Sequence, residues 1–401
     1  MSDGHAAGTA AVRLPTLDAA SRPDGQLINE LAYLAEERGA LDLALGAPDF
    51  APPPELARAA VAAFRKASHQ YTRNAGLPEL CRGIADRAGA LHGAAVDAEA
   101  EVTVTCGVTE ATMAALLALG RPGSEVVLFE PCYVNYLPAV QAAGMTPRLV
   151  RLHGRDWELD RQELARAFNA NTRLVLLNTP GNPSGKVFDA AELAAVAELC
   201  ERWNAWCVSD EIYERLVFGG RRHLSALAVP GLRERSAVAS GFSKTYGVTG
   251  WRVGYVIAPP PLTSVIRGVH EFLTCCAPEP LQAAALAALR LPAAYHERLR
   301  GDLESRRDRL VAALEAAGCA CRRADGSFFV MADVSRCGLG DDAAFVRRLI
   351  EEIGVAAVPG SAFYAERGAG ASLVRFCFGK SEQTIAGAVQ RLGRLRPPAC
   401  P

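Results

Sequence analysis

Short apolar runs alternate with longer helical runs between residues 101 and 258 of the chain. The β-rich runs cover residues 101–107, 125–130, 172–180, 206–211, 236–242 and 252–258, and the helical runs cover residues 109–120, 136–144 and 190–204. An alternation of this kind is typical of a mainly parallel sheet that is covered by helices on both faces. We therefore expect an α/β fold for this part of the chain.

The pattern changes near residue 292, where a long run rich in arginine and glutamate predicts a helix. This helix is expected over residues 293–317, and residues 327–334, 354–360 and 373–379 read as strands of a smaller α+β unit. We predict a flexible arm (1–25), a segment contributing to the small domain (26–53), a large ligand-binding domain (54–292) that begins with a helix over 54–66, and a small C-terminal α+β domain (293–401).

The composition excludes several classes of protein. With 43 Lys+Arg and 44 Asp+Glu, the formal net charge of −1 argues against a nucleic-acid or membrane-surface partner. No stretch reaches the roughly 18–20 apolar residues of a membrane span, and the N-terminus does not resemble a secretory signal. The 12 cysteines include no CxxC pair, and the 7 histidines show no metal-ligand spacing. We expect no metal site and a cytoplasmic protein.

Lysine is scarce in this chain and one lysine stands in an unusual setting. Only Lys66, Lys186, Lys244 and Lys380 are lysines among the 43 basic residues. Lys244 lies in SGFSKTYGVTGWRVGY (240–255), after a predicted strand and eight positions before Arg252. Lysine, unlike arginine, can lose its proton and attack a carbonyl. Together with the Ser243 hydroxyl, the motif therefore suits a ligand that carries an aldehyde and a phosphate.

Four other predicted strands also end in groups that could bind such a ligand, and ligands of open α/β sheets collect at strand ends. The groups are the helix-start amides of Val108 and Thr109, the ring of Tyr133, the Asn182 side chain in NTPGNPSG, and Asp210 with Tyr213 in SDEIYE. Taken singly, each of these features is more often a turn, a packing residue or a helix cap than a ligand-binding group. Together with Lys244 they are the parts that hold pyridoxal phosphate: a Schiff-base lysine, an aspartate for the pyridinium nitrogen and a phosphate cup.

By the motifs NTPGNPSG, SDEIYE and SGFSKTYGVTGWRVGY, residues 25–395 resemble the class I/II aminotransferases, which are fold-type I enzymes dependent on pyridoxal phosphate. The resemblance implies that Lys244 forms the aldimine and shuttles the proton between Cα and the cofactor carbon. It implies that Asp210 keeps the ring nitrogen protonated. It also implies that Tyr213 and Asn182 hydrogen-bond the ring hydroxylate and that Tyr133 stacks on the ring face. The phosphate would be held by Val108, Thr109, Ser243 and Arg252.

The same resemblance implies a substrate site and a dimer. Arg375 in LVRFCFG matches the arginine that grips the substrate α-carboxylate, beside Asn182, and Gly46 in LGAPDF matches the segment that closes over that carboxylate. Tyr71 matches a residue that reaches the phosphate of the neighbouring subunit, so a homodimer is expected. The predicted reaction moves an amino group between an L-amino acid and a 2-oxo acid.

Departures from the family pattern leave alternatives open. Gly241 replaces a serine common in relatives, while Gly247-Val248 and Tyr364 replace residues expected near the substrate. The same cofactor residues would also serve elimination, replacement, cyclisation, decarboxylation or oxidation. A ligand-sensing regulator of this fold would need a DNA-binding module, for which about 25 preceding residues are too few. The apolar surroundings of APDF and LTCCAP favour a neutral or aromatic substrate side chain.

Overall fold

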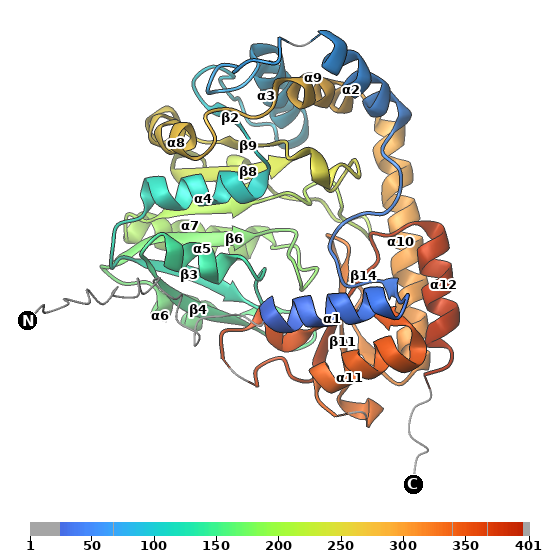
Figure 1. Cartoon of the computed structure of the whole chain (residues 1–401). Helices are drawn as coiled ribbons and strands as arrows, with labels where there is room; N and C mark the ends of the chain where they lie inside the picture. Colours follow the sequence, from blue (N-terminus) through green and yellow to red (C-terminus); the bar gives the residue numbers. More distant parts are fainter. Residues whose placement is uncertain (1–24, 67, 339, 367, 396–401) are drawn as a thin grey trace, which may run out of the picture.

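The computed structural model describes residues 25–66, 68–338, 340–366 and 368–395 (Figure 1). The predicted N-terminal arm lies outside these residues, apart from Gly25. Within the described part of the chain, no helix is both long and apolar enough to cross a membrane.

An eight-stranded sheet forms the centre of the larger part of the molecule. In spatial order its strands are β2 (Val102–Thr105), β9 (Gly254–Ile257), β8 (Ser236–Gly241), β7 (Trp206–Asp210), β6 (Thr172–Asn178), β3 (Glu125–Glu130), β4 (Thr146–His153) and β5 (Glu158–Leu159). The five central strands, from β8 to β4 in this order, pair with one another in parallel. Strand β9 pairs antiparallel with both β8 and β2. The predicted mainly parallel α/β sheet is confirmed.

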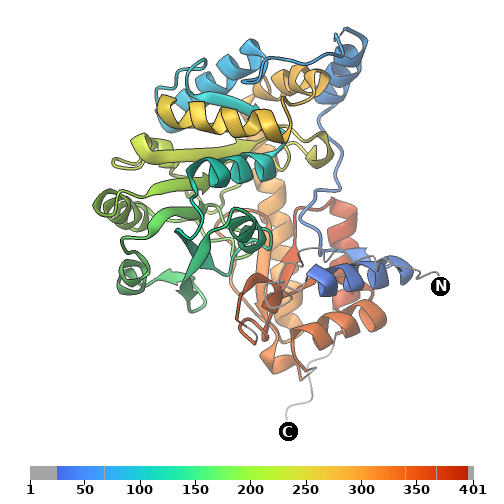
Figure 2. The ribbon, with the colours of Figure 1, turned by 60° about the vertical axis from the view of Figure 1, so that its left-hand side comes forward.

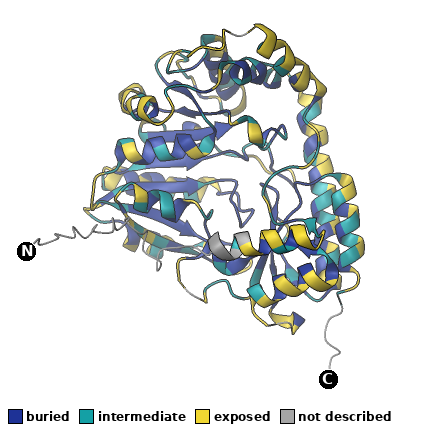
Figure 3. Ribbon diagram, in the orientation of Figure 1, coloured by how far each residue is buried: buried dark blue, intermediate teal, exposed yellow. Residues whose placement is uncertain are grey.

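Helices cover both faces of this sheet, as the alternation predicts. One face packs against α4 (Val108–Leu119), α5 (Tyr136–Ala142) and α8 (Pro260–Leu273), and the other belongs to the core formed with α3 (Pro78–His92), α6 (Arg161–Ala167), α7 (Ala190–Arg202) and α9 (Glu279–Leu289). Successive side chains of a strand point to opposite faces. Val126 and Leu128 therefore join the first core, and Val127 and Phe129 join the second. Figure 3 shows the strands as a buried layer between the helices.

A smaller sheet carries the C-terminal part of the chain. Its antiparallel strands are β10 (Ala320–Cys321), β11 (Phe329–Asp333), β14 (Leu373–Cys377) and β13 (Val358–Pro359), and its helices are α10 (Ala293–Ala316), α11 (Asp342–Arg348) and α12 (Glu382–Leu392). The predicted long helix thus corresponds to α10, which runs from the level of α9 to that of α12 (Figures 1 and 2). Short helical turns cover Ala226–Ala228, Arg233–Arg235, Thr249–Trp251, Ser335–Cys337, Leu349–Ile353 and Gly360–Phe363.

We propose that the domain boundaries lie near residues 54 and 292, as the sequence predicts. Two contacts support joining residues 26–53 to the C-terminal part. Helix α1 (Gly25–Glu37) packs against β12 (Val355–Ala356), and β1 (Leu41–Asp42) pairs with β12 in parallel. The chain then crosses to α2 (Pro54–Lys66), which packs against α9 of the larger part (Figure 1).

Two glycines let the start of α4 approach the large sheet. A Cβ atom on Gly254 would lie 2.7 Å from the carbonyl carbon of Gly107 and 2.8 Å from the nitrogen of Val108. Gly241 pairs with Gly254, and its Cβ would lie 2.9 Å from the Gly254 Cα. The interior is too densely packed to admit such contacts without movement. In this chain, a side chain at position 241 would require the Gly254 backbone to move, which agrees with the glycine found there.

Replacing Gly254 by alanine should destabilise the protein because α4 must move away from β9. Overpacking of this kind costs about 1–3 kcal/mol. Gly250→Ala is the matched control, since a Cβ there meets no atom within 4 Å. For Gly254→Ala we expect unfolding at a lower urea concentration, with an unchanged dependence of the unfolding free energy on urea. For Gly250→Ala we expect an unfolding midpoint close to that of the wild type. Equal midpoints for all three proteins would contradict the close approach.

Candidate active site

A cavity of about 420 Å³ lies where the ends of the large-sheet strands meet α1 and the smaller sheet. All predicted site residues except one line it: Gly46, Val108, Thr109, Tyr133, Asn182, Asp210, Tyr213, Ser243, Lys244, Arg252 and Arg375. Tyr71 is the exception, because it follows α2 on the surface and is 81% exposed. The strand ends that the sequence singled out thus meet at one place, and the roles of these residues stay predictions.

Asp210 ends β7 with a buried carboxylate. Its Oδ2 accepts a hydrogen bond of 2.8 Å from the Tyr136 hydroxyl, and its Oδ1 accepts one of 3.1 Å from the Ile212 amide. Burial raises the pKa of Asp210 from 3.8 to about 6, against the opposing effects of these bonds and of the Lys244 charge. No side chain among the described residues forms an ion pair with Asp210, so a cationic ligand group would stabilise the carboxylate.

Lys244 is the lysine of the cavity. Its Nζ donates a hydrogen bond of 2.6 Å to the Gly46 carbonyl, and burial lowers its pKa from 10.5 to about 8. The other lysines are placed differently. Lys186 and Lys380 are held in ion pairs with carboxylates, and Lys66 is exposed at the end of α2. Lys244 therefore combines access to the cavity with an easily deprotonated amine, which a nucleophilic lysine requires.

An anion site lies at the start of α4. The unpaired amides of Val108 and Thr109 face the cavity together with Ser243 and the Arg252 guanidinium. Gly107 precedes the helix with a φ of 83°, and a Cβ there would lie 2.4 Å from Arg252 Nη2. The guanidinium therefore lies directly against this turn, and the donors together fit a phosphate.

Arg375 is buried in β14 on the opposite side of the cavity. It donates hydrogen bonds of 2.8 Å to Asn182 Oδ1 and of 2.6 Å to the Ala44 carbonyl. The rings of Phe329 and Phe363 lie 4.4 and 4.7 Å from the guanidinium carbon. Its Nε has no hydrogen-bond partner. A fixed guanidinium with an unused buried donor fits the carboxylate of a ligand.

The two predicted tyrosines differ in their surroundings. Tyr213 is buried edge-on against Phe328, with ring centroids 5.1 Å apart, and desolvation raises its pKa well above the ordinary value. Tyr133 is half-buried and its hydroxyl accepts a hydrogen bond of 3.0 Å from Asn135. Its ring lies edge-on against that of Tyr136. Both tyrosines therefore present fixed rings to the cavity.

Several cavity residues were not predicted from the sequence. The polar ones are Thr112, Asn135, Tyr136, Asn178 and Thr249, and an apolar wall is formed by Ile28, Leu31, Leu45, Val358 and Phe363. Tyr136 could have been found, because it follows the same strand as Tyr133. No sequence motif marked the wall, since its members come from α1, the segment after β1, β13 and the turn that follows β13, and resemble ordinary core residues.

The expectation that Gly247-Val248 and Tyr364 lie near the substrate was wrong, because none of them lines the cavity. Gly247 has a φ of 64° and packs against Phe50, and Val248 belongs to the core. Tyr364 is buried, with the guanidinium carbon of Arg151 5.7 Å from its ring centroid. Packing holds the Gly247 backbone and the side chains of Val248 and Tyr364 away from the cavity, which motif position alone does not reveal.

A group with metal-ligand chemistry lies outside the cavity. His92, Glu211 and Glu214 bring ligand atoms within 4.8 Å of one another. Spacing could not reveal this group, since α3 contributes the histidine and the turn after β7 contributes the carboxylates. Arg87 pairs with Glu214 at 3.3 Å, and His223 contacts Glu211 at 2.8 Å, so both carboxylates already have side-chain partners.

Comparisons with known proteins agree with this geometry. The family model for aminotransferase class I and II matches residues 38–392. The chain is 37% identical to the methionine aminotransferase of Escherichia coli (strain K12), over 92% of this chain and 95% of that protein. It is 39% identical to the probable N-succinyldiaminopimelate aminotransferase DapC of Mycobacterium tuberculosis (strain ATCC 25618 / H37Rv), over 91% and 95%.

A solved structure gives the same result. The N-succinyldiaminopimelate aminotransferase from Mycobacterium tuberculosis superposes on this chain with a TM-score of 0.91 at 38% identity, covering 95% of this chain and 100% of that one. The predicted fold-type I architecture is confirmed. The family model spans most of the chain. The named relatives are aminotransferases, and each matches this chain over nearly its whole length. The chain therefore belongs to the class I and II aminotransferase family and is an aminotransferase.

Proposed function

We propose that this aminotransferase holds pyridoxal phosphate at Lys244 and acts on L-amino acids with neutral, largely apolar side chains. The charge on the cavity wall carries this proposal. Among the described residues that line the cavity, the charged ones are Asp210, Lys244, Arg252 and Arg375. Each of them has a task toward the cofactor or the α-carboxylate. No charge in this lining is left for a substrate side chain.

The wall that remains for the side chain is apolar. It consists of Ile28 and Leu31 from α1, Leu45 from the segment after β1, Val358 from β13 and Phe363 from the helical turn after β13. An ionised side chain against such a wall would lose its hydration without gaining a partner, which is strongly unfavourable. Methionine, the substrate in the name of the Escherichia coli relative, has a neutral side chain of the kind that fits here.

The residues of the cavity fit pyridoxal phosphate. The ring nitrogen, when protonated, would give Asp210 the cationic partner that its buried carboxylate lacks. The start of α4 with Ser243 and Arg252 would hold the phosphate, Tyr213 and Asn182 the ring hydroxyl, and Tyr133 the ring face. When bound, the cofactor supplies an aldehyde that links to amines and a ring that accepts an electron pair.

Three residues would then carry the reaction. Arg375 binds the substrate α-carboxylate and so fixes the direction of the Cα–H bond. Lys244 takes the proton from Cα and delivers it to the cofactor carbon, a transfer worth about two to four orders of magnitude in rate. Asp210 keeps the ring nitrogen protonated. The first amino acid leaves as a 2-oxo acid, and its amino group passes to a second 2-oxo acid.

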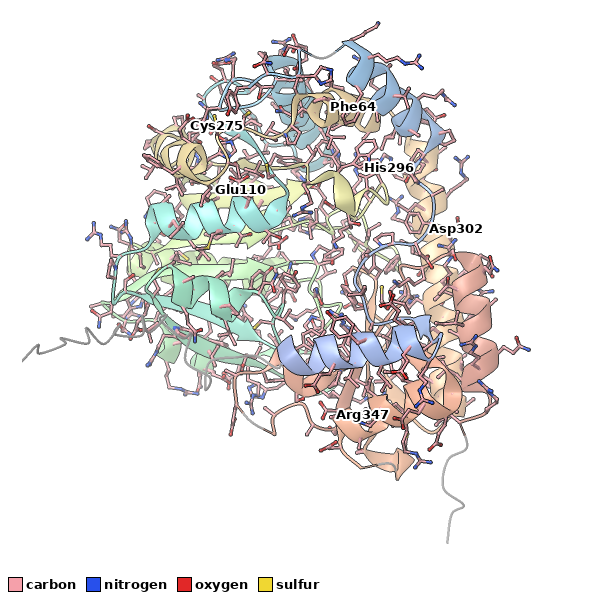
Figure 4. The ribbon with its side chains drawn as sticks, in the orientation of Figure 1. Phe64, Glu110, Cys275, His296, Asp302 and Arg347 are labelled. Carbon is pink, nitrogen blue, oxygen red and sulfur yellow. The ribbon has the colours of Figure 1, made fainter. Side chains whose placement is uncertain are left out.

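We also propose that the enzyme is a homodimer in which Tyr71 reaches the partner's phosphate site. Large apolar side chains are exposed on α2, which precedes the Tyr71 loop, and on α8: Val61 and Phe64 on α2, and Val265, Phe272 and Leu273 on α8, with Phe272 91% exposed (Figure 4 labels Phe64). Asn74 ties the Tyr71 loop to α8 through a hydrogen bond of 2.7 Å to Glu271. Exposed apolar side chains on both helices favour an interface on this part of the molecule.

A cytoplasmic location is a further part of the proposal. It is supported by the cysteines of the described chain, which are all free thiols. Structural disulfides are rare in reducing compartments.

Purified enzyme should convert neutral L-amino acids far better than acidic ones. Leaving a buried carboxylate unpaired costs at least about 3 kcal/mol, so kcat/KM for methionine, phenylalanine or leucine should exceed that for aspartate or glutamate by about 100-fold or more. The 2-oxo acid products are followed by mass spectrometry. Lys244→Ala should give no product, and Arg375→Lys should lose activity with every substrate.

Each contrary outcome of this panel has a distinct meaning. A preference for aspartate would refute the substrate class and leave the transaminase intact. Release of ammonia without a matching aminated product would refute transamination itself.

Protein freed of cofactor should recapture pyridoxal phosphate with a pH dependence set by Lys244. Because only the unprotonated amine attacks the aldehyde, the capture rate should rise with pH through a midpoint near 8, the lowered pKa of Lys244. An unperturbed lysine would give a midpoint above pH 10. The visible absorption of the captured cofactor is followed in stopped flow, with Lys244→Ala as the control that develops no such band.

Hybrid dimers should reveal which subunit Tyr71 serves. A purified dimer of one Lys244→Ala subunit and one Tyr71→Ala subunit retains one complete site if Tyr71 acts on the partner. It should then show about half of the wild-type activity, although each variant alone is impaired. A dimer with both substitutions in one subunit and none in the other should be impaired at both sites. The reverse result would show that Tyr71 acts within its own chain.

A further inference from the structure

A buried ionic cluster lies on the face of the large sheet that packs against α3, away from α4. It consists of Arg87, His92, Glu211, Glu214 and His223, with hydroxyl groups from Ser240, Tyr246 and Tyr255. Ser240 precedes Gly241 in β8, and its hydroxyl contacts Glu214 rather than the cavity. The mechanism described above uses none of these groups.

Glu214 is the acceptor at the centre of this cluster, and its side chain is 6% exposed. Four donors reach its carboxylate: Arg87 at 3.3 Å, His92 at 3.0 Å, Ser240 at 3.2 Å and Tyr255 at 3.3 Å. Burial alone would raise the pKa of Glu214, but the bond from His92 and the charge of Arg87 hold it well below the usual range. Glu214 is therefore a fixed negative charge over the whole working pH range.

Arg87 connects this carboxylate to the turn that carries Lys244. One of its terminal nitrogens donates to Glu214, and the other donates to the Tyr246 hydroxyl at 3.2 Å. Its guanidinium also lies over the rings of Phe242 and Tyr246, 6.0 and 5.8 Å from their centroids. The Tyr246 hydroxyl lies 3.2 Å from Nε2 of His296 on α10, which Figure 4 labels. Tyr246 is thus fixed from two sides.

The connected turns hold the groups that face the cavity. Glu214 follows Asp210 and Tyr213 in one turn, and Tyr246 follows Lys244 in the other. Arg87, Glu214 and Tyr246 do not themselves line the cavity, so they can act on a ligand there only through these neighbours. A buried ion pair seldom adds stability over apolar residues of the same volume. Geometric control is a role that the pair can fill and that apolar residues cannot.

We propose that Arg87 and Glu214 are positioning residues whose ion pair fixes the turn of Asp210 relative to the turn of Lys244. The pair thereby sets how the carboxylate and the amine meet opposite ends of one cofactor. The inference rests on the proposed function, in which both groups contact pyridoxal phosphate.

Variants of the holoenzyme test this role. Arg87→Met and Glu214→Gln remove one charge each at similar side-chain length, and Tyr246→Phe removes only the hydroxyl. The control is Arg233→Met, which breaks the partly buried pair between Arg233 and Glu101 (2.8 Å) just before β2. The measurements are thermal unfolding, kcat and KM for a good substrate, and the pH titration of the visible band of the bound cofactor.

We expect the titration of that band to shift by about half a pH unit or more in Arg87→Met and Glu214→Gln. We expect kcat to fall about 10- to 100-fold, as for other small misplacements, with KM changed less than about twofold. Tyr246→Phe should change both quantities in the same direction by a smaller factor. Arg233→Met should lose thermal stability without moving the titration or kcat.

Variants that unfold at lower temperature but keep the wild-type titration and kcat would overturn the proposal and leave the cluster a purely structural one. If Arg87→Met does not fold, Tyr246→Phe decides, since it retains every charge. A wild-type protein that shows no visible band would refute the cofactor proposal and this one with it. If the wild-type protein shows the visible band and the variants titrate as the wild type does, only the positioning role is refuted.

Discussion

The burial of Asp210 at the end of a central parallel strand is the constraint on which the site depends. The same low-dielectric cavity that raises the pKa of its carboxylate to about 6 lowers the pKa of Lys244 to about 8. Burial thus disfavours the charged form of both groups. An acid that lacks a cation and an amine that readily loses its proton are matched to one ligand, which brings a basic ring nitrogen to the first and an aldehyde to the second. Both groups are therefore suited to the proposed cofactor, which would complete the site.

The twofold period of the strands separates this chemistry from the groups behind it. Along the chain, Asp210 faces the cavity, whereas the next residue, Glu211, bonds to His223. In the same way Ser240 reaches Glu214, whereas Gly241 leaves room beside Gly254 for the start of α4. Because neighbouring residues of a strand point to opposite faces, one short motif contributes to both the ligand site and the buried cluster. A substitution in such a motif can therefore alter the site without touching the ligand.

The sequence predicted most clearly what is local in the chain. Motifs at strand ends identified the cavity residues, since a parallel sheet brings those ends to one edge. Long-range contacts were missed: the hydrogen bond from Tyr136 to Asp210, and the bridge that Arg87 makes from α3. Strand β4 was missed because Arg148, Arg151 and His153 interrupt its apolar pattern. Val248 and Tyr364 were misplaced since a motif gives the position of a residue and not the direction of its side chain.

The residues proposed to bind the cofactor and those proposed to select the substrate come from different parts of the chain. The groups assigned to the cofactor stand on the large sheet, whereas the apolar wall comes from α1, the segment after β1, and the smaller sheet with the turn after β13. Arg375 belongs to the second set, yet Asn182 of the first set accepts one of its hydrogen bonds. That bond would fix the proposed carboxylate site relative to the cofactor site, while those members of the wall that do not pack against Arg375, as Phe363 does, are freer to change. Substitutions in α1 or near Val358 could therefore alter the preferred side chain and leave the cofactor chemistry intact, because no residue of the wall has a task in proton transfer.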